Sequence, residues 1–170
     1  MRRKSFEDME CGIARALETI GDPWSFLIVR DALFGARTFD AFHRNLGIAK
    51  NTLSDRLAHL VEVGVLARDQ DPEDGRRVTY MLLEKGEELI VVLIALSQWG
   101  NKWAFPDTGA PSFVADRKSA SPVAQVQIES RNGEALSAAD LMMIPGPSAS
   151  DRLRQAFDDM KKRTAPNANF

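Results

Sequence analysis

The strongest constraint on the fold is a run of four short helical periods, each closed by a glycine, that gives way to an alternation of period two. Apolar residues recur in these segments at spacings of three and four, and glycine commonly follows the last turn of a helix. The segments run from Ile13 to Ile20, Phe26 to Leu33, Phe39 to Leu46 and Leu53 to Val61, and they are followed by Gly21, Gly35, Gly47 and Gly64. We therefore expect four short helices.

The pattern after Gly64 is typical of a β-hairpin. Residues 77–82 have a period of two that places Val78, Tyr80 and Leu82 on one face, and the turn-rich run 71–75 separates them from the segment 65–68. Residues 84–103 then return to a helical period, with an apolar stripe that requires a partner surface. The order predicts a mainly α protein with a small β component, a winged helix-turn-helix followed by a dimerisation helix.

A change of composition predicts the domain organisation. The chain has 170 residues and 44% hydrophobic content, enough for one cored domain and a modest appendage. We expect a main domain at 1–105, a linker at the breaker-rich 106–111, and a small β appendage with a terminal helix at 112–170. Within the appendage, the Asn132-Gly133 pair is a strong hairpin signal.

Charge and cysteine content exclude several classes of function. The net charge of −2 gives no bulk attraction to nucleic acid or to an anionic membrane, so any DNA-binding surface must be local. No apolar stretch approaches the ~20 residues of a membrane-spanning helix, and we expect a cytoplasmic protein without a membrane partner. Cys11 is the only cysteine, and His43 and His59 have no companions at metal-ligand spacing. We expect no metal, no cofactor, no catalytic residues and no enzymatic activity.

Several motifs resemble the HxlR-type transcriptional regulators, which are relatives of the MarR group. The motifs are Cys11 to Leu17, Gly21 to Trp24, Leu27 to Asp31, Phe39 to Phe42, Lys50 to Leu57 and Leu83 to Gly86. The resemblance covers about the first hundred residues. It implies a homodimeric DNA-binding regulator whose partners are a double-stranded DNA operator and a second copy of the chain, with a small-molecule effector of unknown identity as a further candidate.

The candidate recognition helix is 49–63. If its leucines face inward, the helical period places Lys50, Asn51, Ser54 and Asp55 outward, with Thr52, Arg56 and His59 on the flanks. Asn51 can pair with adenine, and Lys50 can reach guanine or a phosphate. Arg56 suits a phosphate or an internal pair with an acidic neighbour, whereas Asp55 is repelled by phosphates unless it accepts from cytosine or pairs with an arginine. The alternative is a solvated helix face.

Further candidate DNA contacts lie outside this helix. Arg76 and Arg77 belong to the expected wing, 71–77, where guanidinium groups can reach phosphates or a minor groove. Arg37 and Thr38 begin the third helix and are candidates for phosphate contacts. The alternative for the two wing arginines is that they pair with neighbouring acidic residues and only solubilise the hairpin.

Two reading helices one DNA turn apart require a dimer. The candidate dimerisation residues are Ile13, Leu17, Leu96, Trp99 and Trp103. The alternative is that the two tryptophans cover the core of their own domain.

Cys11 lies at the start of the first helix, where a helix N-terminus favours the thiolate. Several HxlR-like regulators sense oxidants or electrophiles through a cysteine in this motif, so the resemblance makes Cys11 a candidate redox sensor; a structural thiol is the alternative. Longer members carry paired cysteines where Ser119, Glu129 and Asn132 stand here, which predicts a metal-free appendage.

The leading hypothesis is a sequence-specific transcriptional regulator, with repression as the expected outcome, that binds a pseudo-palindromic operator. Two alternatives stay open. One is a winged-helix protein-interaction module that does not read DNA, because the chain has no net basic charge and Asp55 lies on the outward face. The other is a thiol-based sensor regulator acting through Cys11.

Overall fold

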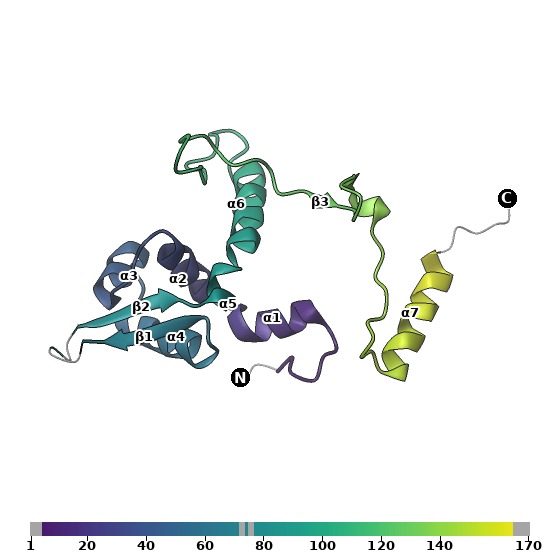
Figure 1. Cartoon of the computed structure of the whole chain (residues 1–170), viewed down its shortest axis with the longest axis horizontal. Helices are drawn as coiled ribbons and strands as arrows, with labels where there is room; N and C mark the ends of the chain where they lie inside the picture. Colours follow the sequence, from purple (N-terminus) through teal and green to yellow (C-terminus); the bar gives the residue numbers. More distant parts are fainter. Residues whose placement is uncertain (1–4, 72–73, 75–76, 165–170) are drawn as a thin grey trace. The chain divides into compact units, whose positions relative to one another are not determined.

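The computed structural model describes residues 5–71, 74 and 77–164 (Figure 1). Ala16–Val126 forms one compact unit, and the described parts of Met1–Arg15 and Gln127–Phe170 form another. In chain order the first elements are α1 (Gly12–Ile20), α2 (Pro23–Leu33), α3 (Phe39–Leu46), α4 (Lys50–Glu62), β1 (Leu66–Gln70), β2 (Val78–Leu82), α5 (Glu84–Glu87) and α6 (Ile90–Ala104). None of the helices in the described residues is long and apolar enough to cross a membrane.

This order is that of a winged helix-turn-helix, as the sequence predicts. Helices α2, α3 and α4 and the base of the hairpin pack around one core, in which burial of each large apolar side chain stabilises the fold by about 1.5–3 kcal/mol. The core residues are Ile20, Ile28, Val29, Ala32, Phe42, Ile48, Leu53, Leu57, Leu60, Val65 and Leu66.

The local signals at the helix ends are satisfied. The carboxylate of Asp22 caps α2 by accepting the N–H groups of Trp24 and Ser25. The hydroxyl of Thr38 caps α3, and α3 ends at Gly47, whose φ of +60° is left-handed and favours glycine. The connection from α3 to α4 is only three residues long, which is the tight turn typical of a helix-turn-helix.

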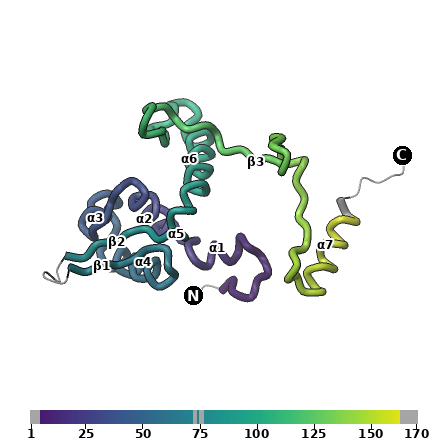
Figure 2. The backbone as a smooth tube through the Cα atoms, in the orientation of Figure 1, coloured from purple at the N-terminus to yellow at the C-terminus, as the bar shows by residue number. Residues whose placement is uncertain are grey.

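The wing is an antiparallel hairpin in which Leu66 pairs with Leu82 and Gln70 pairs with Val78. Figure 2 shows the strands β1 and β2 running side by side. The hairpin is joined to the helices by an isolated bridge between Thr38 and Thr79 and by the bond from Tyr80 N–H to the Arg37 carbonyl, at 2.7 Å. These bonds fix the wing against the start of α3.

The prediction of one helix from Glu84 to Trp103 is wrong, because the segment forms two helices, and α5 ends at Glu87 before α6 begins at Ile90. Helix α5 is held on the base of the wing. Lys85 Nζ donates to the Val63 carbonyl at 2.8 Å, and the backbone of Gly86 passes so close that an added Cβ would lie 2.5 Å from the Val65 oxygen.

The segment after α6 is held by two amides of that helix. Gln98 accepts the Val126 N–H at 2.8 Å and donates to the Ala124 carbonyl at 2.9 Å, while Asn101 donates to the Ser112 carbonyl at 2.9 Å. Residues 112–126 therefore belong with the larger unit.

The smaller unit contains β3 (Ile128–Glu129), β4 (Ala135–Leu136), the 3-10 helix η1 (Ala138–Asp140) and α7 (Asp151–Thr164). The hairpin predicted from Asn132-Gly133 is present, with Gly133 at a φ of +81°, but its strands are only two residues long. The N-terminal segment joins this unit through Glu10, whose carboxylate accepts the backbone N–H of Ser150 at 3.0 Å and its hydroxyl at 2.6 Å.

Candidate nucleic-acid interface

Helix α4 presents the two faces that the sequence predicts. Its leucines Leu53, Leu57 and Leu60 are buried in the core, and this orientation fixes which side chains face outward. The residues predicted to face outward, Lys50, Asn51, Ser54 and Asp55, are all exposed, and the predicted flanking residues Thr52, Arg56 and His59 are half-buried. The outward face therefore carries an amide, a hydroxyl and an ammonium group, which suit base edges and phosphates, and a carboxylate, which repels phosphates and can accept only from a base donor.

The first turn of α4 has no side-chain cap, because Ala49 stands at the N-cap position. The carbonyl of Ala49 accepts the Leu53 N–H at 2.9 Å, and the turn is anchored by Ile48, which is buried. The first N–H groups of a helix have no partners within the helix and can donate to an anion such as a phosphate. The end of α4 beside Lys50 and Asn51 is thus chemically suited to a nucleic-acid backbone.

Arg56 and His59 bind within the protein. The Nε atom of Arg56 lies 3.5 Å from Asp22 Oδ1, so the internal pair is the arrangement that the structure shows. The Nε2 atom of His59 lies 2.8 Å from the Thr19 carbonyl oxygen and joins α4 to the end of α1. Both contacts fix the orientation of α4 relative to the helices behind it.

Arg37 and Thr38 also have structural partners. Nη1 of Arg37 donates to the carbonyls of Ala32 and Ala36, at 2.5 and 2.9 Å, so its guanidinium folds back on the end of α2. The Thr38 hydroxyl accepts the Ala41 N–H at 3.3 Å. Both residues remain exposed at the surface.

On the wing, Arg77 is exposed, and its backbone closes the hairpin tip through bonds to Asp74 and Asp71. The Arg77 N–H donates to the Asp74 carbonyl at 2.8 Å, and the Arg77 carbonyl accepts the Asp71 N–H at 2.9 Å. The other predicted wing contact, Arg76, lies outside the described residues.

Helix α6 has no buried residue in the structure. Leu96, Trp99 and Trp103 are each more than half exposed, so they do not cover the core of their own domain. Lys102 Nζ lies 4.9 Å from the centre of the Trp103 ring. Val91, in the apolar run that opens this helix, is also exposed.

On α1, Ile13 and Leu17 are likewise exposed. Cys11 directly precedes this helix, and its carbonyl accepts the Arg15 N–H at 3.0 Å. The residue is partly exposed in a groove of the smaller unit lined by Phe6, Met9 and Leu153 among others. Its thiol is therefore not fully enclosed. Within the described part of the chain, no group of His, Cys, Asp and Glu residues could hold a metal ion.

Comparison with known proteins gives consistent matches. The family described as HxlR-like helix-turn-helix matches residues 19–108. An uncharacterized HTH-type transcriptional regulator of Mycobacterium tuberculosis is 36% identical over 141 residues, which are 83% of this chain and 89% of that protein.

Two solved structures, both described as candidate transcription factors, are also similar. PA1607 is 38% identical with a TM-score of 0.79, and the match covers 84% of this chain and all of that one. PA1374 from Pseudomonas aeruginosa is 39% identical with a TM-score of 0.62, covering 86% and 99%. The similarity therefore extends beyond the winged helix-turn-helix into the appendage.

Proposed function

Because this chain belongs to the HxlR-like helix-turn-helix family and is a transcriptional regulator with a helix-turn-helix domain, we propose that it represses transcription by binding a pseudo-palindromic DNA operator as a homodimer. Helix α4 would enter the major groove, and the wing would lie on the backbone or in the minor groove. The observation that carries the proposal is the outward face of α4, where Lys50, Asn51 and Ser54 are exposed above a buried leucine stripe.

The exposed side chains divide into base-reading and phosphate-binding groups. Asn51 can donate to and accept from one adenine edge, and Lys50 can bind guanine acceptors or a phosphate. Thr52 and Ser54 supply shorter hydrogen-bonding groups. Asp55 would accept from cytosine, which makes it a residue that selects against other bases at that position.

The arginines play a different part from the one expected for free cations. Arg56 is paired with Asp22, and Arg37 is folded onto α2, so both act first by holding α4 and the start of α3 in place. Thr38 does the same as the cap of α3. Arg77, together with Arg76 beyond the described residues, supplies the wing contact to the DNA backbone.

The exposed apolar faces of α6 and α1 support the homodimer. The dimerisation residues of the proposal are those whose side chains the chain itself leaves exposed: Ile13, Leu17, Leu96, Trp99 and Trp103. Exposed tryptophans of this kind are typical of association surfaces, where their large rings gain most from burial. A dimer would place two copies of α4 in successive major grooves on one side of the duplex.

The test is fluorescence anisotropy of the full chain with the DNA upstream of its own gene, titrated over a range of salt concentrations. We expect the logarithm of the binding constant to fall linearly with the logarithm of salt concentration, by about 0.9 per phosphate neutralised. A scrambled duplex of the same length should bind at least 10³-fold more weakly. Weak binding that is indifferent to sequence at physiological salt would contradict the proposal, as would a strictly monomeric protein.

Two observations favour a second function, a protein-interaction module that does not read DNA. Two of the candidate cations, Arg37 and Arg56, are engaged within the protein, and Asp55 is exposed on the outward face of α4. The same titration separates the two functions, because a module of this kind would show no sequence-dependent DNA binding at any salt concentration.

The partly exposed Cys11 supports control of DNA binding by thiol oxidation. Oxidation to a disulfide with the same residue of the second subunit, or alkylation by an electrophile, would alter the start of α1 and with it the dimer. This control is an addition to the repressor proposal, and its failure would leave DNA binding untouched.

A further inference from the structure

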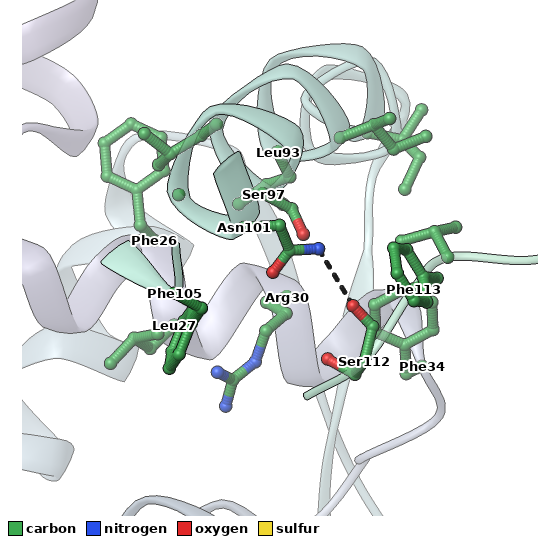
Figure 3. A pocket seen from close by; sticks show the side chains of 15 residues that line it. Phe26, Leu27, Arg30, Phe34, Leu93, Ser97, Asn101, Phe105, Ser112 and Phe113 are labelled. Atoms are coloured by element: carbon green, nitrogen blue, oxygen red, sulfur yellow. Dashed lines mark hydrogen bonds between the residues drawn. The ribbon is translucent and has the colours of Figure 1, made fainter. Parts of the chain in front are cut away.

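The larger unit contains an open hollow of about 760 Å³ between α2, α6 and residues 112–114 (Figure 3). This volume lies within the ~300–1,000 Å³ of typical small-molecule sites. Four phenylalanines, Phe26, Phe34, Phe105 and Phe113, are among the residues that line it. Phe34 and Phe113 are 59% and 64% exposed, so the hollow presents aromatic surface that the chain does not cover. An aromatic occupant would bury this surface and stack against its rings.

Arg30 is the only charged residue among those that line the hollow. Its Nε and Nη2 atoms both donate to Asp31 Oδ1, at 2.9 and 2.7 Å, which fixes the guanidinium. Its Nη1 atom has no hydrogen-bond partner in the part of the chain that the structure describes. Asp31 is 8% exposed, so it anchors the arginine from within the fold. A guanidinium held in this way offers its remaining N–H groups to a second carboxylate.

The hollow also offers hydrogen-bonding groups on α6. Asn101 donates through Nδ2 to the Ser112 carbonyl, as the dashed line in Figure 3 shows, and this bond leaves its Oδ1 atom as an acceptor. The hydroxyl of Ser97 lies in the same wall. A mainly apolar site with one cation and a few fixed polar groups is the composition expected for an amphipathic small molecule.

We propose that this hollow binds a small aromatic carboxylic acid. The aromatic ring lies among the four phenylalanines, and the carboxylate accepts hydrogen bonds from Nη1 of Arg30. Because the Arg30–Asp31 pair is neutral as a whole, selectivity for the acid comes from directed hydrogen bonds to the guanidinium and not from net positive charge.

A regulatory consequence follows and rests on the proposed function. Helix α2 packs on both α3 and α4, whereas α6 carries the exposed apolar face of the proposed dimer. A ligand that contacts both α2 and α6 can therefore change the spacing of the two copies of α4 in the dimer. It would regulate DNA binding if the ligand has different affinities for the DNA-bound and DNA-free forms of the protein.

The test is calorimetric titration of the DNA-free full chain with 1-naphthoate and with 1-naphthalenemethanol, its neutral analogue. We expect one naphthoate per chain and at least tenfold weaker binding of the neutral analogue. Absence of naphthoate binding at millimolar concentration, or equal affinity for the two probes, would overturn the proposal. Because no DNA is present, this result is independent of whether the chain represses transcription.

Two variants and one control locate the binding. Gly100 lines the hollow, and a Cβ added there would meet no atom within 4 Å, so Gly100→Leu should fill the space and abolish binding of both probes. The double variant Arg30→Gln/Asp31→Asn keeps a hydrogen-bonded neutral pair and should remove only the preference for naphthoate. Val91→Leu, which enlarges an exposed residue of α6 outside the hollow, should leave both affinities within twofold.

Circular dichroism melts show whether each variant is folded. Sedimentation of each variant shows whether it still forms a dimer, which tests whether a second copy of the chain fills the hollow. If Gly100→Leu breaks the dimer, a second copy of the chain occupies the hollow and the proposal fails. If Gly100→Leu binds both probes as the wild-type chain does, the ligand lies elsewhere and the proposal also fails. If Arg30→Gln/Asp31→Asn keeps the tenfold preference, the carboxylate does not bind Arg30 and the proposed ligand class is wrong.

Discussion

The carboxylate of Asp22 joins the start of α2 to α4, because its Oδ1 atom accepts the N–H groups of Trp24 and Ser25 and lies 3.5 Å from Nε of Arg56. One side chain thus caps α2 and holds an arginine of the proposed reading helix. The Arg56 Nε atom is enclosed and has no hydrogen bond within the described structure, so the contact is a charge pair and not a strong hydrogen bond.

Substitutions at Asp22 separate the cap from the charge pair. Asp22→Asn keeps an acceptor for the α2 N–H groups, whereas Asp22→Ala removes it, and loss of a cap costs about 0.5–2 kcal/mol. We expect urea denaturation to show that Asp22→Ala lowers the free energy of unfolding more than Asp22→Asn does. Because the pair is partly exposed, Arg56→Ala should cost no more than about 1 kcal/mol.

The same variants test the role of Arg56. If Arg56 is a positioning residue, Arg56→Ala should weaken operator binding less than Lys50→Ala does. Asp22→Asn should then weaken operator binding by about the same factor as Arg56→Ala. An Arg56→Ala variant that loses as much affinity and as much salt slope as Lys50→Ala would show that Arg56 binds phosphate directly.

Asn51 and Arg77 should affect DNA binding in different ways. Asn51→Ala should relax base preference at one operator position, because a bidentate amide contact contributes about 1–3 kcal/mol of discrimination. Arg77→Ala should weaken binding to all sequences and reduce the salt slope by about 0.9. Anisotropy with the operator and with single-base variants measures both effects, and identical profiles for the two substitutions would refute the division.

The sequence predicted the winged helix-turn-helix because its signals are local. Periodicity fixed which residues of α4 face inward, and glycine marked each helix end, so the exposed set from Lys50 to Asp55 followed directly. The break before α6 was missed because α5 is held by contacts of Lys85 and Gly86 with Val63 and Val65, which local periodicity does not indicate.

The residues that pair with the arginines could not be predicted from the sequence either. Asp22 and Arg56 are separated by 33 intervening residues, and nothing in their spacing indicates that the core brings them together. The bonds from Gln98 to the backbone of Ala124 and Val126 likewise join residues that are distant in the sequence, and no local pattern indicates them.

Trp99 provides a test of the dimer. Trp99→Glu places a charge on a face that must be desolvated in the dimer, so we expect the dissociation constant to rise at least tenfold in sedimentation equilibrium. The melting temperature at low protein concentration should change little, because Trp99 is 63% exposed in the single chain. An unchanged dissociation constant would show that the dimer interface does not include this face of α6.

Cys11 provides a test of thiol control. Diamide oxidises thiols selectively, and we expect it to weaken operator binding by the wild-type chain and to produce a disulfide-linked dimer on a non-reducing gel. Cys11→Ser should bind the operator as the reduced wild type does and should ignore diamide. A Cys11→Ser protein that still releases DNA under diamide would remove the sensing role.

Glu10 predicts a dependence on pH in the smaller unit. The hydroxyl of Ser150, then its backbone N–H, and more weakly the charge of Arg152, lower the pKa of Glu10 below its ordinary value of 4.5. A lowered pKa means that the carboxylate stabilises this contact fully above pH 4.5 and loses that effect as the pH falls through the folded-state pKa. The NMR shift of the Ser150 amide should therefore stay constant from pH 7 to about 5 and change only below 4.5, with no such titration in Glu10→Gln. A midpoint at or above the ordinary value would mean that Glu10 does not bind Ser150 in solution.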